Sequence, residues 1–180
     1  MYDPRALATA AHTKTMLPEY LSVDVVMERV AIHNRWTSEQ WKPASVDAIG
    51  PGRGASQAPE CLEDGPARSL WRFAGREIEL HPTESEGYYL NVTSDTPVVF
   101  VMWRMRDDSE QPAAAPFIVT LSYNEAGRFM DGGERVDPVP MSASIRDWLA
   151  AYVAVHYKPE PKKKMKRNDP FAGGSFRRDS

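Results

Sequence analysis

Cysteine and long apolar runs are what this sequence has least of. Its 180 residues include one cysteine, Cys61, which excludes an internal disulfide and any metal site built from several thiolates. No stretch approaches the roughly 18 apolar residues of a membrane-spanning helix. The first residues, with Asp3 and Pro4, have no apolar core like that of a signal peptide. These absences predict a protein of a reducing compartment, and we expect a cytoplasmic location.

The short motifs of common enzyme classes are absent as well. The sequence has no Gly-x-Ser-x-Gly, His-Glu-x-x-His or Gly-x-Gly-x-x-Gly pattern. The glycine cluster at 50–54 lacks the Gly-Lys-Ser/Thr ending of a phosphate loop, so residues 50–68 are predicted to form a flexible surface loop. We predict no catalytic residues, no metal ligands and no cofactor. An enzyme is therefore the less favoured class.

One polar stretch leaves two interpretations open. His81, Glu84 and Glu86 bring an imidazole and two carboxylates close together in sequence, which is the chemistry of a metal site or of acid–base catalysis. The same residues suit a polar turn, and the sequence offers them no further catalytic partner. We favour the turn.

Short extended segments fill most of the chain between residues 23 and 123. β-Branched and aromatic residues concentrate in runs bounded by glycine, proline and polar residues, which is typical of strands. Ala74 and Gly75 suit the tight turn of a hairpin between two of these runs. The sequence predicts strands at 23–32, 44–49, 69–73, 76–81, 87–93, 98–106 and 117–123.

Two helices are predicted after the strands. Ser122 and Glu125 have the spacing of a capping box, and two glycines follow at 132–133, so we predict a short helix over 124–131. Residues 134–140 contain too many prolines for a central strand and are predicted to be a bridge. A longer amphipathic helix over 142–157 has one apolar face, which we expect to be buried. That face consists of Ile145, Trp148, Leu149, Tyr152, Val153 and His156.

These elements predict an α+β fold. We expect a mainly antiparallel curved sheet or partial barrel of about seven strands, with the short helix and the C-terminal amphipathic helix packed on it. A seven-stranded barrel with one C-terminal helix is also the outline of pleckstrin-homology-like modules, by analogy of fold alone. We divide the chain into a flexible N-terminal arm (1–21), a single α+β domain (22–157) and a basic, disordered tail (158–180).

Charge is divided unevenly along the chain. Residues 158–180 hold eight Lys or Arg against three acidic residues, whereas the whole chain has a net charge of -3. The tail is therefore basic, at +5, and residues 1–157 are acidic, at -8. Such a tail can contact an acidic protein surface, neutralise nucleic-acid phosphates or keep the protein solvated.

Two tryptophans near the first predicted strand are a second candidate contact surface. They flank a polar turn at 37–40 and either cover the end of a sheet or form a platform on which a ligand stacks. Together with the start of the tail they make up the predicted partner-binding set. Its members are Tyr157, Lys158, Lys162, Lys163, Lys164, Lys166, Arg167, Trp36 and Trp41.

Several strings of the sequence resemble an uncharacterised proteobacterial family. They are HNRW (33–36), WKP (41–43), ESEGYYLNVTS (84–94), VFVMWR (99–104), SYNEA (122–126), MDGGE (130–134), VPM (139–141) and HYKPEPK (156–162). The resemblance covers residues 23–168. That domain of unknown function is typically encoded in gene clusters for molybdenum-dependent formate dehydrogenase, and the family supplies no established catalytic residues.

The resemblance implies a non-enzymatic accessory or assembly protein for formate dehydrogenase, acting by protein–protein contact. Its partner would be a formate dehydrogenase subunit or another maturation factor. One alternative is a nucleic-acid-binding regulator that uses the basic tail. Another is a nucleotide-handling enzyme of molybdenum cofactor maturation, which the failed phosphate-loop pattern disfavours.

Overall fold

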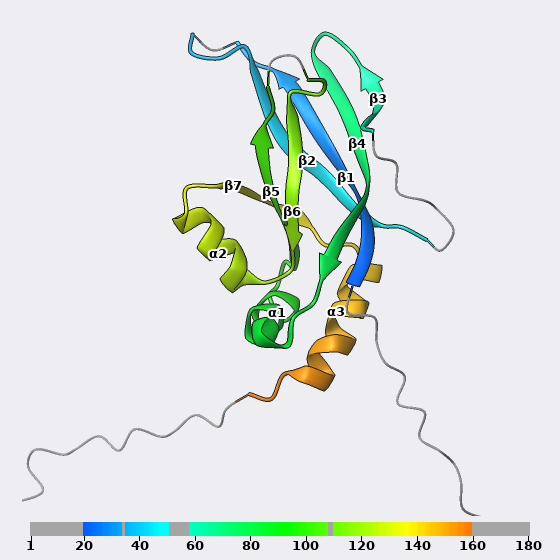
Figure 1. Ribbon diagram of the computed structural model, residues 1–180, viewed down its shortest axis with the longest axis vertical. Helices are drawn as coiled ribbons and strands as arrows, with labels where there is room; N and C mark the ends of the chain where they lie inside the picture. The colour runs from blue at the N-terminus through cyan, green and yellow to red at the C-terminus, as the bar shows by residue number, and fades with distance from the viewer. Residues whose placement is uncertain (1–19, 34, 51–57, 108–109, 160–180) are drawn as a thin grey trace, which may run out of the picture.

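The computed structural model describes residues 20–33, 35–50, 58–107 and 110–159. In these residues the chain folds into two antiparallel β-sheets and three α-helices (Figure 1). Nearly all of the predicted N-terminal arm and of the predicted basic tail lies outside the described residues.

Four antiparallel strands form the larger sheet: β1 (Tyr20–Ala31), β2 (Glu39–Ala48), β3 (Glu60–Asp64) and β4 (Arg68–Glu79). Their order is β2-β1-β4-β3. Val23, Val25 and Met27 alternate along β1 and are fully buried. Since successive side chains of a strand point to opposite faces, this alternation gives the sheet one apolar face that must be covered.

Three antiparallel strands form the smaller sheet: β5 (Val98–Met105), β6 (Ala114–Thr120) and β7 (Arg135–Pro140). The nearly continuous apolar run at 98–103 predicts a central strand covered on both faces. This prediction is confirmed, because β5 is the middle strand and is buried from Val99 to Trp103. β7 is an edge strand, where Pro138 and Pro140 are tolerated because an edge can do without their N–H donors.

The two sheets pack against each other around one core. β2 lies next to β7 and β4 next to β6, and the buried apolar side chains of both sheets belong to a single cluster. In the described residues no hydrogen-bond ladder joins the sheets, so they do not close into a barrel. The α+β class and the antiparallel pairing are confirmed. The expected number of about seven strands is confirmed as well, since the described residues form four strands in one sheet and three in the other. The expected single curved sheet is wrong, because the strands divide between two sheets that do not close into a barrel.

Three α-helices complete the fold: α1 (Ser85–Val92), α2 (Tyr123–Asp131) and α3 (Ala143–His156). α1 lies between α2 and α3 at one end of the sheets (Figure 1). α3 confirms the predicted amphipathic helix. Its buried residues are Ile145, Leu149, Tyr152 and Val153, with Trp148 partly buried beside them. His156, predicted on this face, is exposed and stacks on Tyr152 with ring centroids 4.2 Å apart.

The boundaries of α2 follow from its capping residues. The Ser122 side chain accepts a hydrogen bond of 3.1 Å from the backbone N–H of Glu125, which satisfies one of the free donors at the helix start. Gly132 is the C-cap, and Gly133 has a positive φ of 81°. The short helix and its glycine stop are therefore confirmed.

The strand predicted at 87–93 is wrong, because these residues belong mostly to α1. Tyr88 and Asn91 are three positions apart and fully buried, which is helical spacing. The Asn91 amide donates to the carbonyl oxygens of Val98 at 2.7 Å and Leu121 at 2.8 Å, and its oxygen accepts from the Val98 N–H at 3.0 Å. These tertiary contacts outweigh the β propensity of the aromatic and branched residues.

The hairpin predicted at 69–81 is also wrong, because β4 is one continuous strand with a bulge. Ala74 and Gly75 together face the single residue Asp24 of β1. Gly75 does have the positive φ that a turn needs, 71°, and its N–H donates to the Asp24 carboxylate at 3.3 Å. A glycine in this conformation suits a bulge as well as a turn.

Four further strands differ from prediction. β3 lies inside the stretch predicted as a loop, and all five of its residues are exposed, so no apolar pattern marks it. β7 forms where a bridge was predicted, and β2 begins at Glu39 instead of residue 44. β6 spans Ala114–Thr120 instead of 117–123.

We predict that Gly87→Ala destabilises the protein, because a Cβ there would lie 2.3 Å from the Ser122 Oγ. The free energy of unfolding should fall by about 1–3 kcal/mol. Gly127 of α2 is the matched control, since a Cβ there meets nothing within 4 Å. Gly127→Ala should raise the free energy of unfolding by about 0.5–1 kcal/mol. Urea denaturation followed by circular dichroism measures both, and equal effects would contradict the close packing of α1 on α2.

Candidate functional site

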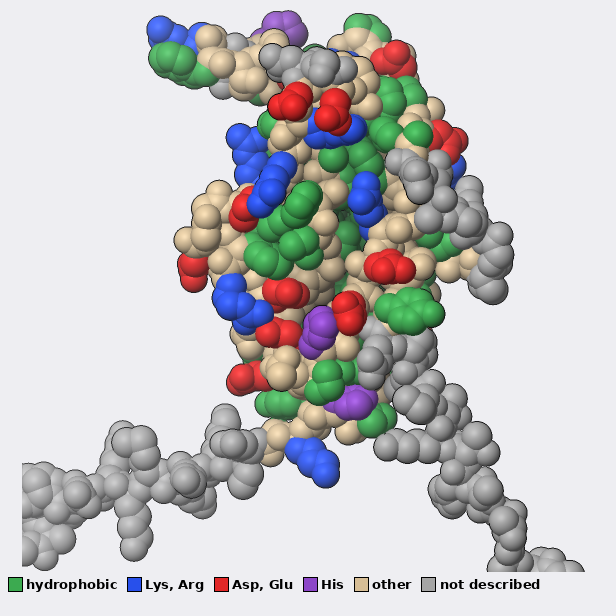
Figure 2. Space-filling view, in the orientation of Figure 1, with side chains coloured by type: hydrophobic (Ala, Val, Ile, Leu, Met, Phe, Trp, Pro, Cys, Tyr) green, Lys and Arg blue, Asp and Glu red, His purple; other side chains and the backbone are tan. Residues whose placement is uncertain are grey.

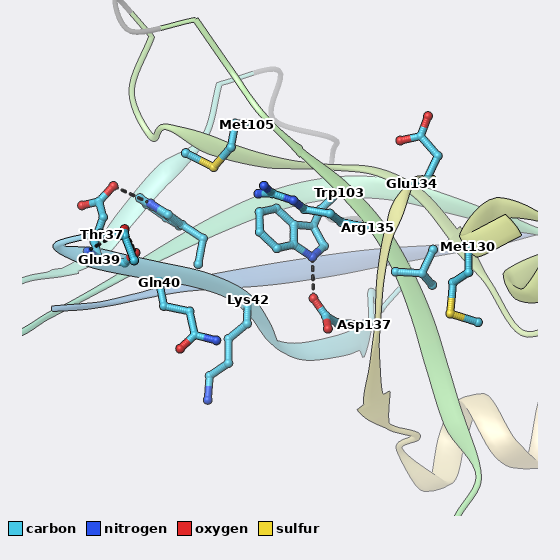
Figure 3. Close-up of a pocket in the computed structure, with 12 residues that line it drawn as sticks. Thr37, Glu39, Gln40, Lys42, Trp103, Met105, Met130, Glu134, Arg135 and Asp137 are labelled. Atoms are coloured by element: carbon cyan, nitrogen blue, oxygen red, sulfur yellow. Dashed lines mark hydrogen bonds between the residues drawn. The ribbon is translucent and has the colours of Figure 1, made fainter. Parts of the chain in front are cut away.

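A cleft lies between the edge strands β2 and β7. Its volume is about 830 Å³, and β2, β5, β7 and the end of α2 contribute its lining (Figure 3). It forms because β2 and β7 approach each other without pairing. Met130 and Met105 supply flexible apolar surface at its rim, since both are about half exposed.

Two indole rings in the cleft are held by carboxylates. Trp41 and Trp103 are each 6% exposed. The Trp41 indole N–H donates to a Glu39 carboxylate oxygen at 2.9 Å, and the Trp103 indole N–H donates to an Asp137 carboxylate oxygen at 2.6 Å (Figure 3). Hydrogen bonds to an ionised acceptor are strong, so each pair fixes the plane of its ring.

Strand register explains how Trp103 is surrounded. Trp103 of β5 is the cross-strand partner of Arg135 of β7, and Asp137 follows on the same face of β7. The Arg135 guanidinium carbon lies 5.2 Å from the centroid of the Trp103 ring, which is cation–π distance. Figure 3 shows the indole between Arg135 and Asp137. The positive charge of Arg135 therefore contacts the face of the Trp103 ring, and the carboxylate of Asp137 accepts the hydrogen bond from its N–H.

The other charges of the cleft are ion-paired. Lys42 lies 3.3 Å from a Glu28 carboxylate oxygen. The hydrogen bond from Arg68 lowers the pKa of Glu28, against the opposite effect of burial, and Lys42 lowers it further. Hydrogen bonds from Arg104 lower the pKa of Glu134 in the same way. Both carboxylates are ionised at neutral pH, whereas a general acid or base works best with a pKa near that pH.

The structure separates the two predicted tryptophans. Trp41 lines the cleft, whereas Trp36 is 79% exposed and does not line it. The Arg35 guanidinium carbon lies 4.6 Å from the centroid of the Trp36 ring. Trp41 is thus both a cover at the start of β2 and part of a ligand-accessible wall.

The two candidates after α3 that the structure describes, Tyr157 and Lys158, do not join this cleft. Tyr157 follows α3 and stacks on Tyr89, with ring centroids 4.6 Å apart, and Lys158 beside it is exposed. Neither lines the cleft. The remaining candidates, Lys162, Lys163, Lys164, Lys166 and Arg167, lie outside the described residues.

The polar stretch around Glu84 joins two elements. Its carboxylate accepts hydrogen bonds of 2.7 Å from the Ser122 hydroxyl and of 2.7 Å from the Arg128 guanidinium. Burial is the largest single effect and raises the pKa of Glu84, but the two hydrogen bonds, together with the charges of Arg128 and His81, leave the pKa below its ordinary value. Within the described ranges, no cluster of His, Cys, Asp and Glu could hold a metal ion. Glu84 thus connects the turn before α1 to the start of α2.

Sequence reasoning missed Trp103, Arg135 and Asp137 as site residues. Trp103 counted only as core of a strand, although its indole N–H needs a partner when buried. Arg135 and Asp137 are two positions apart, which puts them on one face of a strand, but the segment was predicted as a bridge. A correct assignment of β7 as a strand would have placed these two residues on one face beside Trp103.

The fold and the cleft define an α+β protein of two packed antiparallel sheets, with fixed indoles and charged groups displayed between two sheet edges. Such a cleft suits recognition of a ligand or partner. Residues 22–166 match the family described as protein of unknown function (DUF3305), and the chain belongs to that family. Comparisons with curated proteins and with solved structures give no match. Across the described residues, no helix has both the length and the apolar character to cross a membrane.

We predict that the protein loses stability in acid because the stabilising Glu84 carboxylate becomes protonated. Because its pKa in the folded state lies below the ordinary 4.5, the ionised group stabilises the fold above that pH, and this contribution is lost as the pH falls through the folded-state value. Thermal unfolding of wild type and Glu84→Gln should differ most near neutral pH, with wild type the more stable. The difference should shrink below pH 4.5. A difference independent of pH would contradict the role of the ionised carboxylate.

Proposed function

We propose that this protein is a cytoplasmic, non-enzymatic accessory protein of a bacterial molybdenum-dependent formate dehydrogenase. It binds a partner protein, either an enzyme subunit or another maturation factor, in the β2–β7 cleft. The observation that carries the binding role is the pair of carboxylate-held indoles in that cleft. The resemblance of the sequence strings to a family encoded beside formate dehydrogenase genes supports the context.

The cleft has the composition of a protein-binding surface. Tryptophan and arginine dominate the energetics of protein interfaces, and Trp41, Trp103 and Arg135 line this cleft together. Its volume of about 830 Å³ is large enough for several side chains of a bound segment. Fixed ring planes reduce the conformational entropy that binding would otherwise cost.

The edges of the cleft favour side-chain recognition over addition of a strand. Pro43 in β2 and Pro138 and Pro140 in β7 have no N–H to offer an added strand. The recognised segment should therefore present an apolar or aromatic side chain to the apolar lining beside Trp103, where Met105 and Met130 are about half exposed. An acidic side chain beside it would meet Arg135, whose guanidinium lies over the Trp103 ring.

The alternatives make different demands on the surface. On the face drawn in Figure 2, Lys and Arg are interspersed with Asp and Glu and form no continuous basic stripe among the described residues. The nucleic-acid regulator predicted from the sequence would use the basic tail. Its affinity would fall steeply with salt and disappear on deletion of residues 158–180.

A nucleotide-handling enzyme would release or absorb heat with guanine nucleotides and magnesium in calorimetry.

Deletion of the gene in its native host, followed by complementation, tests the proposal. We expect formate oxidation to fall in the deletion strain and to be restored by the wild-type gene. Arg135→Glu should restore it at least about tenfold less well, because a like charge in an interface costs a few kcal/mol. Arg146→Glu is the matched control, since Arg146 is exposed on α3 away from the cleft and should restore activity fully.

Two results would contradict the proposal. Unchanged formate oxidation with fully loaded molybdenum cofactor in the deletion strain would remove the accessory role. Equal loss for Arg135→Glu and Arg146→Glu, with both proteins folded by circular dichroism, would remove the cleft as the contact surface.

A further inference from the structure

A second cavity lies between β4 and β6, and residues at the end of β5 also line it. Its volume is about 340 Å³. The guanidinium groups of Arg76, Arg104 and Arg106 line it together with the rings of Phe73 and Phe117. The cavity combines positive charge with aromatic surface, and partner binding in the β2–β7 cleft does not use that combination.

Two of these arginines already have carboxylate partners. Arg104 forms a two-point pair with Glu134, and its guanidinium carbon lies 4.4 Å from the centroid of the Phe117 ring. Arg106 forms an ion pair with Glu110, four residues further along the chain. Their charges are therefore balanced by the protein itself.

Arg76 has no such partner among the described residues. Its Nε is buried and has no hydrogen-bond partner among the described residues. Its guanidinium carbon lies 5.7 Å from the centroid of the Phe73 ring. Burial lowers the pKa of Arg76, and the neighbouring charge of Arg106 lowers it further. A buried donor without an acceptor destabilises a fold. An added anion would satisfy it.

The bulge in β4 places Arg76 in this cavity. Arg76 pairs with Val23 and Phe73 pairs with Val25, and both valines point to the buried inner face of β1. In a regular strand, residues three apart point to opposite faces, so the extra residue beside Gly75 brings Arg76 to the face that Phe73 occupies. Bulges often re-aim a side chain next to a functional site.

We propose that this cavity is a binding site for a small organic anion. The carboxylate or phosphate group of the ligand pairs with Arg76, and an attached apolar ring packs against Phe73 and Phe117. A guanidinium offers two parallel donors that match the oxygens of a carboxylate or phosphate. The volume of about 340 Å³ is at the small end of ligand pockets, which fits one ring with its anionic group.

Calorimetric titration of the full chain with phenyl phosphate, benzoate and inorganic phosphate tests the site. At least one of the two ring-bearing anions should bind, and about tenfold or more tightly than inorganic phosphate, because inorganic phosphate leaves both rings uncovered. The preferred ring-bearing anion identifies the head group. Binding should weaken at least about tenfold in Arg76→Gln and less in Arg76→Lys, which keeps the charge and loses the fork.

Arg72→Gln is the matched control on the same strand. The Arg72 Nε is also buried without a hydrogen bond among the described residues, but Arg72 is paired with Glu60 and does not line the cavity, so this variant should bind as wild type does. Wild type that binds neither ring-bearing anion overturns the proposal. Equal loss of binding in Arg72→Gln and Arg76→Gln overturns it as well.

Thermal unfolding of the unliganded variants separates a binding role from a structural one. If Arg76 binds a ligand, Arg76→Gln should unfold at the same temperature as wild type or higher, because a partly buried charge with no carboxylate partner among the described residues has been removed. A melting temperature lowered by more than about 5 °C, together with no anion binding by wild type, would make Arg76 a structural residue and overturn the proposal.

Discussion

The two sheets bury their inner faces against each other without sharing a hydrogen-bond ladder, and the rest of the molecule depends on this constraint. Apolar faces must be covered, and Val25 of β1 and Val101 of β5 are fully buried in the common core. Because the sheets do not close into a barrel, an open seam remains on each side. One seam, between β2 and β7, holds the fixed indoles. The other, between β4 and β6, holds the arginines.

Buried polar groups fix the end of the smaller sheet. Asn91 bonds the backbone at the start of β5 and just after β6, and Glu84 bonds the residue that caps α2. Tyr88 and Tyr152 meet edge to face between α1 and α3, with ring centroids 6.0 Å apart. Satisfied polar networks of this kind specify one arrangement more sharply than apolar packing does. They hold β5 and β6, and hence the walls of both cavities, in register.

The sequence predicts the parts of this fold that depend on local signals. The period of α3, the cap of α2 and the apolar run of β5 each identify an element with little reference to the rest. The helix α1 was not predicted because the contacts that stabilise it are tertiary: the Asn91 amide bonds Val98 across the turn to β5 and Leu121, which lies 30 residues further along the chain. The bulge in β4 was predicted as a turn because a positive φ at Gly75 is compatible with both conformations. Of the two indoles in the cleft, only Trp41 was predicted as a site residue from the sequence. The contacts of Trp103 can be predicted only when β7 is known to be the neighbour of β5.

The central claim is that the β2–β7 cleft binds a partner protein through its indoles. Nitrogen-15 correlation spectra of the indole N–H groups, recorded with and without purified formate dehydrogenase, test this most directly, because each tryptophan gives a separate signal. The signals of Trp41 and Trp103 should shift or broaden. The signal of Trp148, which belongs to α3 and packs against the core, should change less. Unchanged Trp41 and Trp103 signals in the presence of bound enzyme would contradict the claim.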